Sequence, residues 1–255
     1  MKILILGGKG EGTVFLYNAL RESFSIEKLI IEEPVSKSKL IKRRVKRLGF
    51  LKVFNQLLFQ IFVVRILIFF SKQRRNELLK EKQLIKTPIQ QDKVTHVVTI
   101  NSEKTISIIK DVNPDIILVS GTRIIGKKVL SCSKAKFINL HVGITPKYRG
   151  VHGGYWALAN NEPENCGVTV HLVDQGIDTG KVLAQSIIKP TGKDNFVTYP
   201  YLQFSAGIIQ IKSVLRYYKS HNFFPEFNVN DTTSKLYYHP TFTGYLFKRF
   251  VKGVK

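Results

Sequence analysis

The alternation of short apolar runs with helical patterns constrains this fold more than any other feature of the sequence. Residues 2–6 form a short apolar run, the glycine-rich turn GGKGEG follows, residues 13–23 have a helical pattern, and residues 27–31 resemble a second strand. Strand, turn, helix and strand in this order are typical of an open parallel sheet. We therefore predict an α/β fold, with a mostly parallel Rossmann-like sheet and helices on both faces.

The same alternation returns in the second half of the chain and sets the expected domain organisation. Residues 1–190 are predicted to form the catalytic domain, with residues 36–86 as a helical insertion. Residues 191–255 are predicted to form a long helix and a packed, irregular aromatic tail. The expected strands are 95–99, 115–119, 137–142, 167–173 and 181–188, and the expected helices are 102–110, 155–160 and 195–219.

The insertion differs in character from the rest of the chain. It holds fifteen basic and two acidic residues, so it supplies +13 of the net charge of +22. Its first part, KSKLIKRRVKRLGF, is a basic amphipathic helix pattern, and VFNQLLFQIFVVRILIFF follows. Arg65 would lie deep in a bilayer, which argues against a membrane-spanning helix. Two interpretations stay open: helices that pack on the sheet or form a homodimer interface, and peripheral membrane contact through residues 36–81.

The charge favours anionic partners without choosing among nucleic acid, phosphorylated small molecules and acidic lipid headgroups. A generally lysine-rich surface would give the same composition. Cys132 and Cys166 have no metal-binding spacing and form no disulfide framework, so we expect no metal and a reducing cytoplasm. The N-terminal run MKILILGG is too short for a secretory signal and is expected to be a buried strand.

The first glycine turn has two interpretations. Gly8, Lys9 and Gly10 could form a phosphate or ribose cradle at a helix N-terminus, which makes them candidate acceptor-binding residues. A merely tight turn fits the sequence equally well. The glycines do not complete a dinucleotide fingerprint, so a dehydrogenase is disfavoured although Glu32 and Glu33 end the second strand.

A polar pair ends the apolar run at residues 137–142. Asn139 and His141 lie two residues apart on a strand, so both side chains point to the same face, at the strand's carboxyl end. Ligands bind at that end of open α/β sheets. Asn and His can donate to an oxygen that becomes negative in a transition state, and Asp178, between the two glycines of GIDTG, could assist proton transfer. A single strand-end His would be structural, but these three residues together indicate catalysis.

Two segments resemble the folate-dependent formyltransferase family, which includes glycinamide ribonucleotide, methionyl-tRNA and sugar N-formyltransferases. They are INLHVGITPKYRGVHGGYWAL and GVTVHLVDQGIDTGKVLAQ, within a match over roughly residues 94–188. The resemblance implies that Asn139, His141 and Asp178 are the catalytic residues and that 10-formyltetrahydrofolate is the donor. It implies that Asn139 and His141 stabilise the oxyanion, and that Asp178 keeps His141 protonated and assists proton transfer.

The resemblance also implies binding residues. The donor is expected between the loops 120–126 and 173–178, with the backbone of residues 123–125 on the pteridine edge. The family's mobile loop covers the acceptor side, and its Arg149 either holds a phosphate or pins the loop. The implied donor-binding residues are Ser120, Gly121, Arg123, Ile124, Ile125, Val173, Asp174 and Gly176, and the implied acceptor-side residues are Tyr148, Arg149 and Gly150.

Departures from the family pattern bear on the acceptor. The 77 residues after Asp178 leave little room for a tRNA-binding barrel, and GGKGEGT replaces the G-x-G-S-N phosphate loop of glycinamide ribonucleotide formyltransferases. We therefore expect a small-molecule amine, a nucleotide-linked amino sugar for a surface polysaccharide, rather than nucleic acid. Glycinamide ribonucleotide, methionyl-tRNA and a catalytically silent folate- or nucleotide-binding protein remain alternatives. The expected location is the cytoplasm, with association with the inner membrane face left open.

Overall fold

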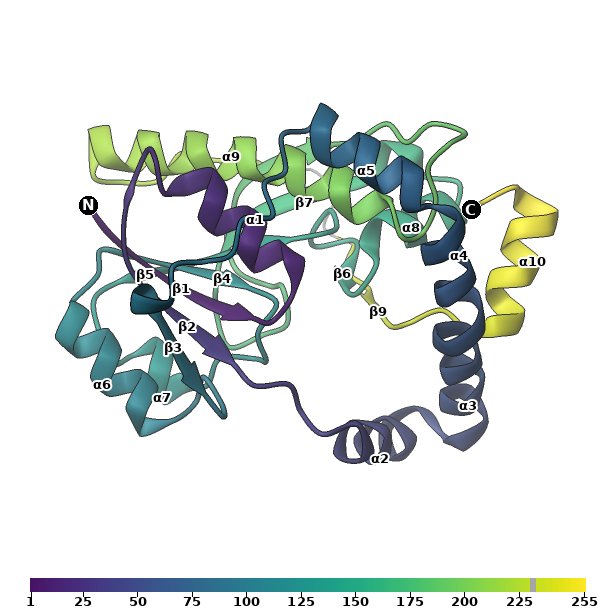
Figure 1. Cartoon of the computed structure of the whole chain (residues 1–255), viewed down its shortest axis with the longest axis horizontal. Coiled ribbons are helices and arrows are strands. Elements are labelled where there is room, and N and C mark those ends of the chain that lie inside the picture. The colour runs from purple at the N-terminus through teal and green to yellow at the C-terminus, as the bar shows by residue number, and fades with distance from the viewer. Residues whose placement is uncertain (230–232) are drawn as a thin grey trace.

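A computed structural model describes residues 1–229 and 233–255 (Figure 1). Its main sheet has seven strands in the order β3-β2-β1-β4-β5-β7-β8. The first five strands of this order are parallel, β7 is antiparallel to β5, and β8 is antiparallel to β7. The predicted open, mostly parallel α/β sheet is confirmed. The strands are β1 (Lys2–Gly8), β2 (Ser25–Glu32), β3 (Val94–Val97), β4 (Ile116–Ser120), β5 (Lys136–His141), β7 (Gly167–Leu172) and β8 (Val182–Ile187).

Helices cover both faces of the sheet. Successive residues of β1 point to opposite faces, so Ile3 and Ile5 join a core beneath α1 and α9, while Leu4 and Leu6 join the core beneath α6 and α7 (Figure 1). All four side chains are fully buried. The near-continuous apolar runs of the parallel strands therefore follow from burial on both faces. The covering helices are α1 (Glu11–Leu20), α6 (Glu103–Val112), α7 (Lys127–Leu130) and α9 (Tyr199–His221).

The strand order reverses direction between β1 and β4, which opens a crevice at their carboxyl ends. The first glycine turn is tight here for a steric reason. A Cβ on Gly8 would lie 2.4 Å from the carbonyl oxygen of Gly121, and one on Gly12 would lie 2.2 Å from the ring of Phe204. These two glycines let the turn approach the β4 loop and α9 closely.

The insertion is helical, as predicted, but it packs differently. Its main contacts are with α9 and α10 rather than with the sheet, so the predicted packing on the sheet is wrong. Residues 50–70 form one long helix with a π-helical turn. The most apolar stretch of this helix has a mean hydropathy of 2.0, and 22% of that stretch is buried. By length and composition this helix could cross a membrane. The insertion comprises α2 (Lys37–Leu48), α3 (Phe50–Leu58), η1 (Phe59–Val63), α4 (Val64–Phe70) and α5 (Lys72–Glu81).

The predicted irregular tail is also wrong in part, because it contains the helix α10 (Phe242–Lys252). The Thr241 side chain caps this helix by accepting from the backbone N–H of Gly244. Its periodicity was hidden because Phe247 and Phe250, on the outer face, are as apolar as the buried Tyr245. Before it, β9 (Leu236–Tyr237) pairs with β6 (Arg149–Gly150), which ties the tail to the loop after β5.

Candidate functional site

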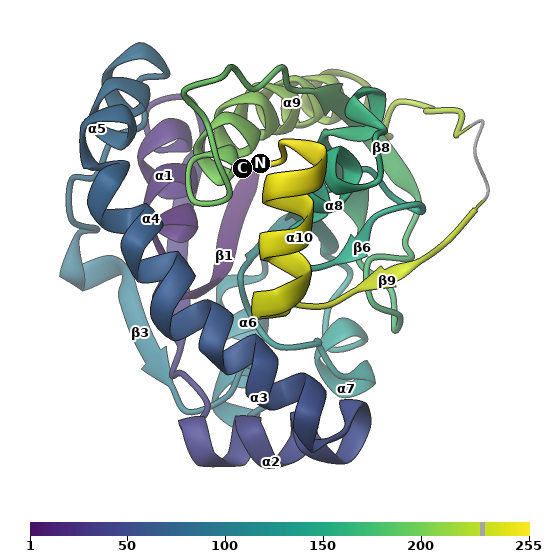
Figure 2. The ribbon, with the colours of Figure 1, turned by 90° about the vertical axis from the view of Figure 1, so that its right-hand side faces the viewer.

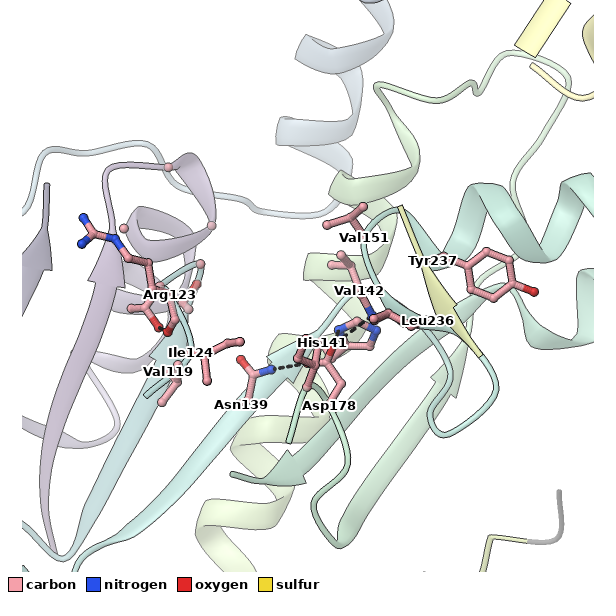
Figure 3. A pocket seen from close by; sticks show the side chains of 18 of the residues that line it. Val119, Arg123, Ile124, Asn139, His141, Val142, Val151, Asp178, Leu236 and Tyr237 are labelled. Atoms are coloured by element: carbon pink, nitrogen blue, oxygen red, sulfur yellow. Dashed lines mark hydrogen bonds and ion pairs between the residues drawn. The ribbon is translucent and has the colours of Figure 1, made fainter. Parts of the chain in front are cut away.

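A pocket of about 770 Å³ lies at the carboxyl ends of β1, β4 and β5. Its size is in the range of ordinary ligand-binding sites. Asn139, His141 and Asp178 all line it, and Figure 3 shows them facing one another from β5 and the loop after β7. The pocket brings together most of the predicted site: Gly8, Lys9, Gly10, Ser120, Gly121, Arg123, Ile124, Ile125, Gly150, Val173, Asp174 and Gly176 also line it.

The three predicted catalytic side chains are within contact distance. His141 Nδ1 lies 3.3 Å from Asp178 Oδ2. Asn139 Nδ2 donates to Asp178 Oδ1 over 3.4 Å. The Gly150 backbone N–H donates to Asp178 Oδ2 over 2.9 Å, which holds the carboxylate between the two loops. Asp178 has a left-handed backbone (φ 52°), which Asp tolerates better than most residues.

His171 is a fourth member of this cluster that the sequence analysis missed. It lies directly opposite Asn139 on the antiparallel strand β7 and is 2% exposed. Its Nδ1–H donates to the carbonyl of Leu172, so Nε2 is left to accept from Asn139 Nδ2 at 3.1 Å. His171 therefore fixes the orientation of the Asn139 amide. Only the strand register places it there, and the sequence does not give that register.

Burial and two polar neighbours act in opposite directions on the pKa of His141. Burial lowers its pKa below the usual value, against the attraction of Asp178 and the Tyr148 carbonyl. For Asp178, burial would raise the pKa, but the neighbouring His171 and His141 side chains and the hydrogen bond from the Gly150 N–H hold it below its ordinary value. These two shifts favour an ionised Asp178 beside a neutral His141, whereas the role of Asp178 in keeping His141 protonated stays a prediction. The His141 Nε2–H donates to the Tyr148 carbonyl over 2.8 Å, so Nδ1 and Asp178 Oδ2 together can accept one proton.

The predicted donor loop is present, but part of its backbone is already bonded. The Arg123 N–H donates to Glu32 Oε2 over 2.9 Å, and the Ile124 carbonyl accepts from Asn101 over 3.0 Å. Pairing of a pteridine with the backbone of residues 123–125 stays a prediction, and it would have to use groups other than the Arg123 N–H and the Ile124 carbonyl. Glu32 also accepts from the Ile100 N–H, so it braces this loop rather than facing a ribose.

Two predicted acceptor-side residues do not line the pocket. Tyr148 is fully buried, and its hydroxyl donates to Glu162 over 2.8 Å. Arg149 donates from Nη1 to the carbonyl of Ile177 over 3.0 Å, so it pins the loop that carries Asp178. Of the two roles considered for Arg149, the structural one is what the geometry provides. At the other end of the pocket, Lys9 is paired with Glu33 at 2.7 Å.

Arginines from the insertion line the same pocket, and the sequence analysis did not assign them. Arg43, Arg44 and Arg47 come from α2, and the guanidinium of Arg47 lies 5.1 Å from the ring centroid of Tyr238. Burial lowers the pKa of Arg44. Because Arg retains its charge at neutral pH, this part of the wall is cationic. The tail contributes Leu236, Tyr237, Tyr238 and His239 to the same wall.

A second histidine pair makes the folding stability depend on pH. His152 Nε2 and His239 Nδ1 are 3.0 Å apart. Burial, with Arg44 nearby, lowers the pKa of His152 to about 3 and that of His239 to about 4. Both pKa values lie below that of an unfolded histidine, which is about 6.5. The two neutral imidazoles therefore stabilise the fold fully above about pH 6.5, and this stabilisation declines as the pH falls toward their folded pKa values.

We expect urea unfolding to report a loss of about 2 kcal/mol for each of these two imidazoles between about pH 7 and about pH 5. Carboxylates with lowered pKa values, such as Asp194, lose their contribution only at lower pH, so this window belongs to histidines. A His239→Gln variant should show a shallower pH dependence, and a variant of the exposed His96 (His96→Gln) should match the parent. Equal stability at both pH values would contradict the assignment.

Comparisons with known proteins identify the family of this chain. Residues 53–199 match the family described as Formyl transferase. A methionyl-tRNA formyltransferase from Finegoldia magna is 42% identical over 91 residues. A sugar N-formyltransferase structure from a Shewanella species has a TM-score of 0.57 and 15% identity, and covers 92% of this chain and 75% of that chain. Glycinamide ribonucleotide transformylase 1 from Symbiobacterium toebii has a TM-score of 0.55 and 15% identity, with coverages of 86% and 88%.

These similarities differ in extent. The match to the Finegoldia magna protein covers 35% of this chain and 29% of that protein, and a relative from Thermodesulfovibrio yellowstonii is matched to the same extent. This chain thus spans less than a third of the length of those relatives. At 15% identity, the two structural neighbours establish a shared fold and nothing finer.

Proposed function

Because this chain belongs to the formyltransferase family, we propose that it transfers a formyl group from 10-formyltetrahydrofolate to the primary amine of an acceptor, and that the acceptor is a nucleotide-linked amino sugar. The observation that carries this proposal is the cluster of Asn139, His141 and Asp178 in one pocket, with His141 Nδ1 3.3 Å from Asp178 Oδ2. A binding-only relative would have no chemical need for this arrangement.

The geometry assigns a distinct task to each side chain. Asn139 Nδ2 is a neutral donor that would exchange its long, 3.4 Å contact with Asp178 Oδ1 for the formyl oxygen, on which negative charge develops during attack by the amine. The neutral Nδ1 of His141 and the ionised Asp178 accept the proton that the attacking nitrogen loses. The resulting imidazolium, paired with Asp178, helps to stabilise the oxyanion and can return the proton to the departing nitrogen. The new carbon–nitrogen bond to the acceptor forms first, and the carbon–nitrogen bond to the donor nitrogen then breaks as that nitrogen takes up the proton.

The residues around the pocket fit a folate donor. The bound donor would supply the formyl carbon. The loops 120–126 and 173–178 both line the pocket beside Asn139, and the side chain of Ile124 is 56% exposed, which offers an apolar surface to a flat heterocycle. Ser120, Gly121 and Val173 line the same region. These residues would bind and orient the donor while Asn139 meets its formyl oxygen.

The cationic wall supports a phosphate-bearing acceptor. Arg43, Arg44 and Arg47 line one pocket with the catalytic cluster, and guanidinium groups bind phosphates strongly through paired N–H donors. Tyr238 on the same wall offers an aromatic ring to a base or sugar. A diphosphate joined to a nucleoside on one side and to an amino sugar on the other combines all these features.

A panel assay tests the proposal. The protein is incubated with 10-formyltetrahydrofolate and one acceptor at a time: nucleotide-linked amino sugars, glycinamide ribonucleotide or methionyl-tRNA, and release of tetrahydrofolate is followed. We expect turnover with an amino sugar nucleotide. With that acceptor, an Arg43→Gln/Arg44→Gln double variant should raise KM by about tenfold to a hundredfold with little change in kcat, because these arginines bind ground state and transition state alike.

A control on the same helix separates this effect from a general loss of charge. Lys39 is exposed and lies outside the pocket lining, so Lys39→Gln should leave KM unchanged. An unchanged KM in the arginine double variant would remove the acceptor assignment. If none of the acceptors causes release of tetrahydrofolate, the proposed formyl-transfer activity itself is wrong.

Methionyl-tRNA is the second candidate acceptor. The relatives from Finegoldia magna and Thermodesulfovibrio yellowstonii are named methionyl-tRNA formyltransferases, and the net charge of +22 suits a polyanion. The panel decides between the two. Turnover of methionyl-tRNA with a steep decrease as salt rises would favour the tRNA acceptor, and turnover of a sugar nucleotide with weak salt dependence would favour our choice.

A further inference from the structure

One side of the molecule exposes an unusually large set of apolar side chains. Figure 2 looks onto this side, where α3 and α4 run beside α10 in front of the rest of the chain. Monomeric proteins rarely expose contiguous apolar patches of this extent without a partner. We call this surface the apolar face. It consists of Phe50, Leu51, Phe54, Ile61, Phe62, Ile66, Phe69 and Phe70 from the long helix and Phe247, Phe250 and Val251 from α10, each between 45% and 81% exposed.

The long helix has a second, opposite stripe that is fixed to the protein. Val53 and Phe59 are at most 1% exposed, and the ring of Phe59 packs edge-on against Phe196 with centroids 5.0 Å apart. The Gln56 amide donates to the carbonyl of His239 over 2.7 Å. A membrane-spanning position would break these contacts. The helix is therefore arranged to lie along a surface, with one stripe on the protein and the other outward.

Positive charge surrounds the apolar face. The helix α2, at the foot of the face in Figure 2, carries seven basic residues and no acidic one among its twelve residues. Lys39, Lys42 and Lys46 on this helix are exposed and do not line the catalytic pocket. Arg65 on the long helix and Lys72 at the start of α5 are also exposed. Exposed phenylalanines bordered by lysine and arginine are the composition of helices that bind the interface of anionic membranes.

A groove of about 550 Å³ adds to this pattern. It lies between α4 and α10 and combines an apolar lining with several cationic groups. Such a groove matches an acyl chain beneath an anionic headgroup. Its apolar side chains include Phe62, Ile66, Phe70, Leu246 and Phe250, and its basic ones are Arg74, Lys193, Arg249 and Lys255.

We propose that the apolar face binds the surface of an anionic phospholipid bilayer, with the long helix and α10 parallel to the membrane plane and α2 against the headgroups. This goes beyond the proposed function, since it concerns where the enzyme works and not which bond it makes. It has one consequence for that function. The arginines of α2 that line the pocket lie on the element that contacts the headgroups, so the acceptor would enter beside the membrane.

Vesicle flotation tests this proposal without donor or acceptor, so its result is independent of any formyl transfer. The full chain is mixed with phosphatidylcholine vesicles that contain or lack phosphatidylglycerol. We expect flotation with the anionic vesicles and little with the neutral ones. Phe69→Ser/Phe70→Ser should lower the partition coefficient about tenfold or more, because two exposed rings no longer enter the interface. Lys39→Gln/Lys42→Gln/Lys46→Gln should lower it about a hundredfold at low salt.

Matched controls carry the same changes on other surfaces. Val98 and Ile209 are 78% and 64% exposed, and Val98→Ser/Ile209→Ser should float like the parent. Lys127→Gln/Lys128→Gln/Lys134→Gln removes three exposed charges on and after α7, outside the apolar face and α2, and should change the partition coefficient little. Absence of flotation of the parent chain with anionic vesicles would overturn the proposal. So would a dimer in solution that Phe69→Ser/Phe70→Ser dissociates without any vesicle binding, since the apolar face would then contact a second copy.

Discussion

Replacing Asp178 with Asn is expected to lower kcat/KM for formyl transfer by about a thousandfold to ten-thousandfold. One oxygen of the carboxylate accepts from Asn139, and the other accepts from the Gly150 N–H and lies 3.3 Å from His141. An amide of the same shape must turn an NH₂ group toward one of these donors. It also lacks the negative charge that supports a proton on the lowered-pKa His141.

The loss should appear in kcat, with near-normal binding of the donor, because the carboxylate acts on the proton of the attacking amine. Steady-state assays with the acceptor that the panel identifies measure it. Asp111→Asn on the exposed side of α6 makes the same chemical change away from the pocket and should be fully active. A folded Asp178→Asn protein with activity within about tenfold of the parent would refute the catalytic role.

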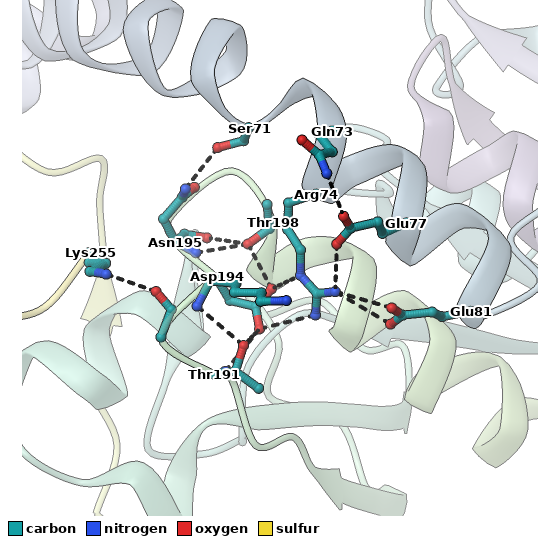
Figure 4. Close-up of polar contacts among 12 residues, drawn as sticks. Ser71, Gln73, Arg74, Glu77, Glu81, Thr191, Asp194, Asn195, Thr198 and Lys255 are labelled. Atoms are coloured by element: carbon teal, nitrogen blue, oxygen red, sulfur yellow. Dashed lines mark hydrogen bonds and ion pairs between the residues drawn. The ribbon is translucent and has the colours of Figure 1, made fainter.

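Replacing Arg74 with Met is expected to destabilise the protein by about 3–5 kcal/mol. Arg74 Nε donates to Asp194 Oδ1 over 2.9 Å, and its Nη2 donates to Oδ2 over 3.4 Å (Figure 4). The Asp194 side chain is completely buried, and its other contacts are the N–H and hydroxyl of Thr191 and the hydroxyl of Thr198. Without the guanidinium, a buried carboxylate would remain with no cationic partner in this network.

Urea unfolding measures this loss, and a second substitution tests its cause. Adding Asp194→Asn removes the stranded charge, so the double variant should regain part of the stability lost in Arg74→Met. Lys72→Met lies on the same helix and is exposed, and it should change the free energy of unfolding by about 0.5 kcal/mol or less. A loss below about 1 kcal/mol in Arg74→Met would show that this pair does not anchor the insertion.

Two of the three residues in the candidate cluster, Asn139 and His141, are related by local rules, whereas Asp178 reaches them only through the fold. Asn139 and His141 share a face through strand periodicity, and the carboxyl end of β5 is where ligands bind in such sheets. His171 could not be predicted in the same way, because it reaches Asn139 only through the antiparallel register of β5 and β7. The state of His141 depends on burial, which is a property of the whole fold.

For the insertion, the sequence predicted the helices but not their packing partners. Helical periodicity in residues 36–86 was evident, but the partner of each helix was not, because apolar side chains surround the long helix on nearly every side. The buried stripe is defined by tertiary contacts, such as those of Phe59 with Phe196 and Tyr245 and of Gln56 with His239. The charge of the α2 arginines is evident from the sequence, but their place in the pocket wall depends on how the insertion packs against α9 and α10.

The attachment of the insertion has a consequence for protein engineering. The residues that we assign to the chemistry lie on β5 and the loop after β7, whereas the arginines assigned to the acceptor lie on a segment joined between β2 and β3. Exchange of residues 36–86 between related enzymes would thus redirect the choice of amine while the formyl-transfer machinery is retained. A working chimaera would have to take the segment around Asp194 and α10 from the parent that supplies residues 36–86, since both contact the helices of the insertion.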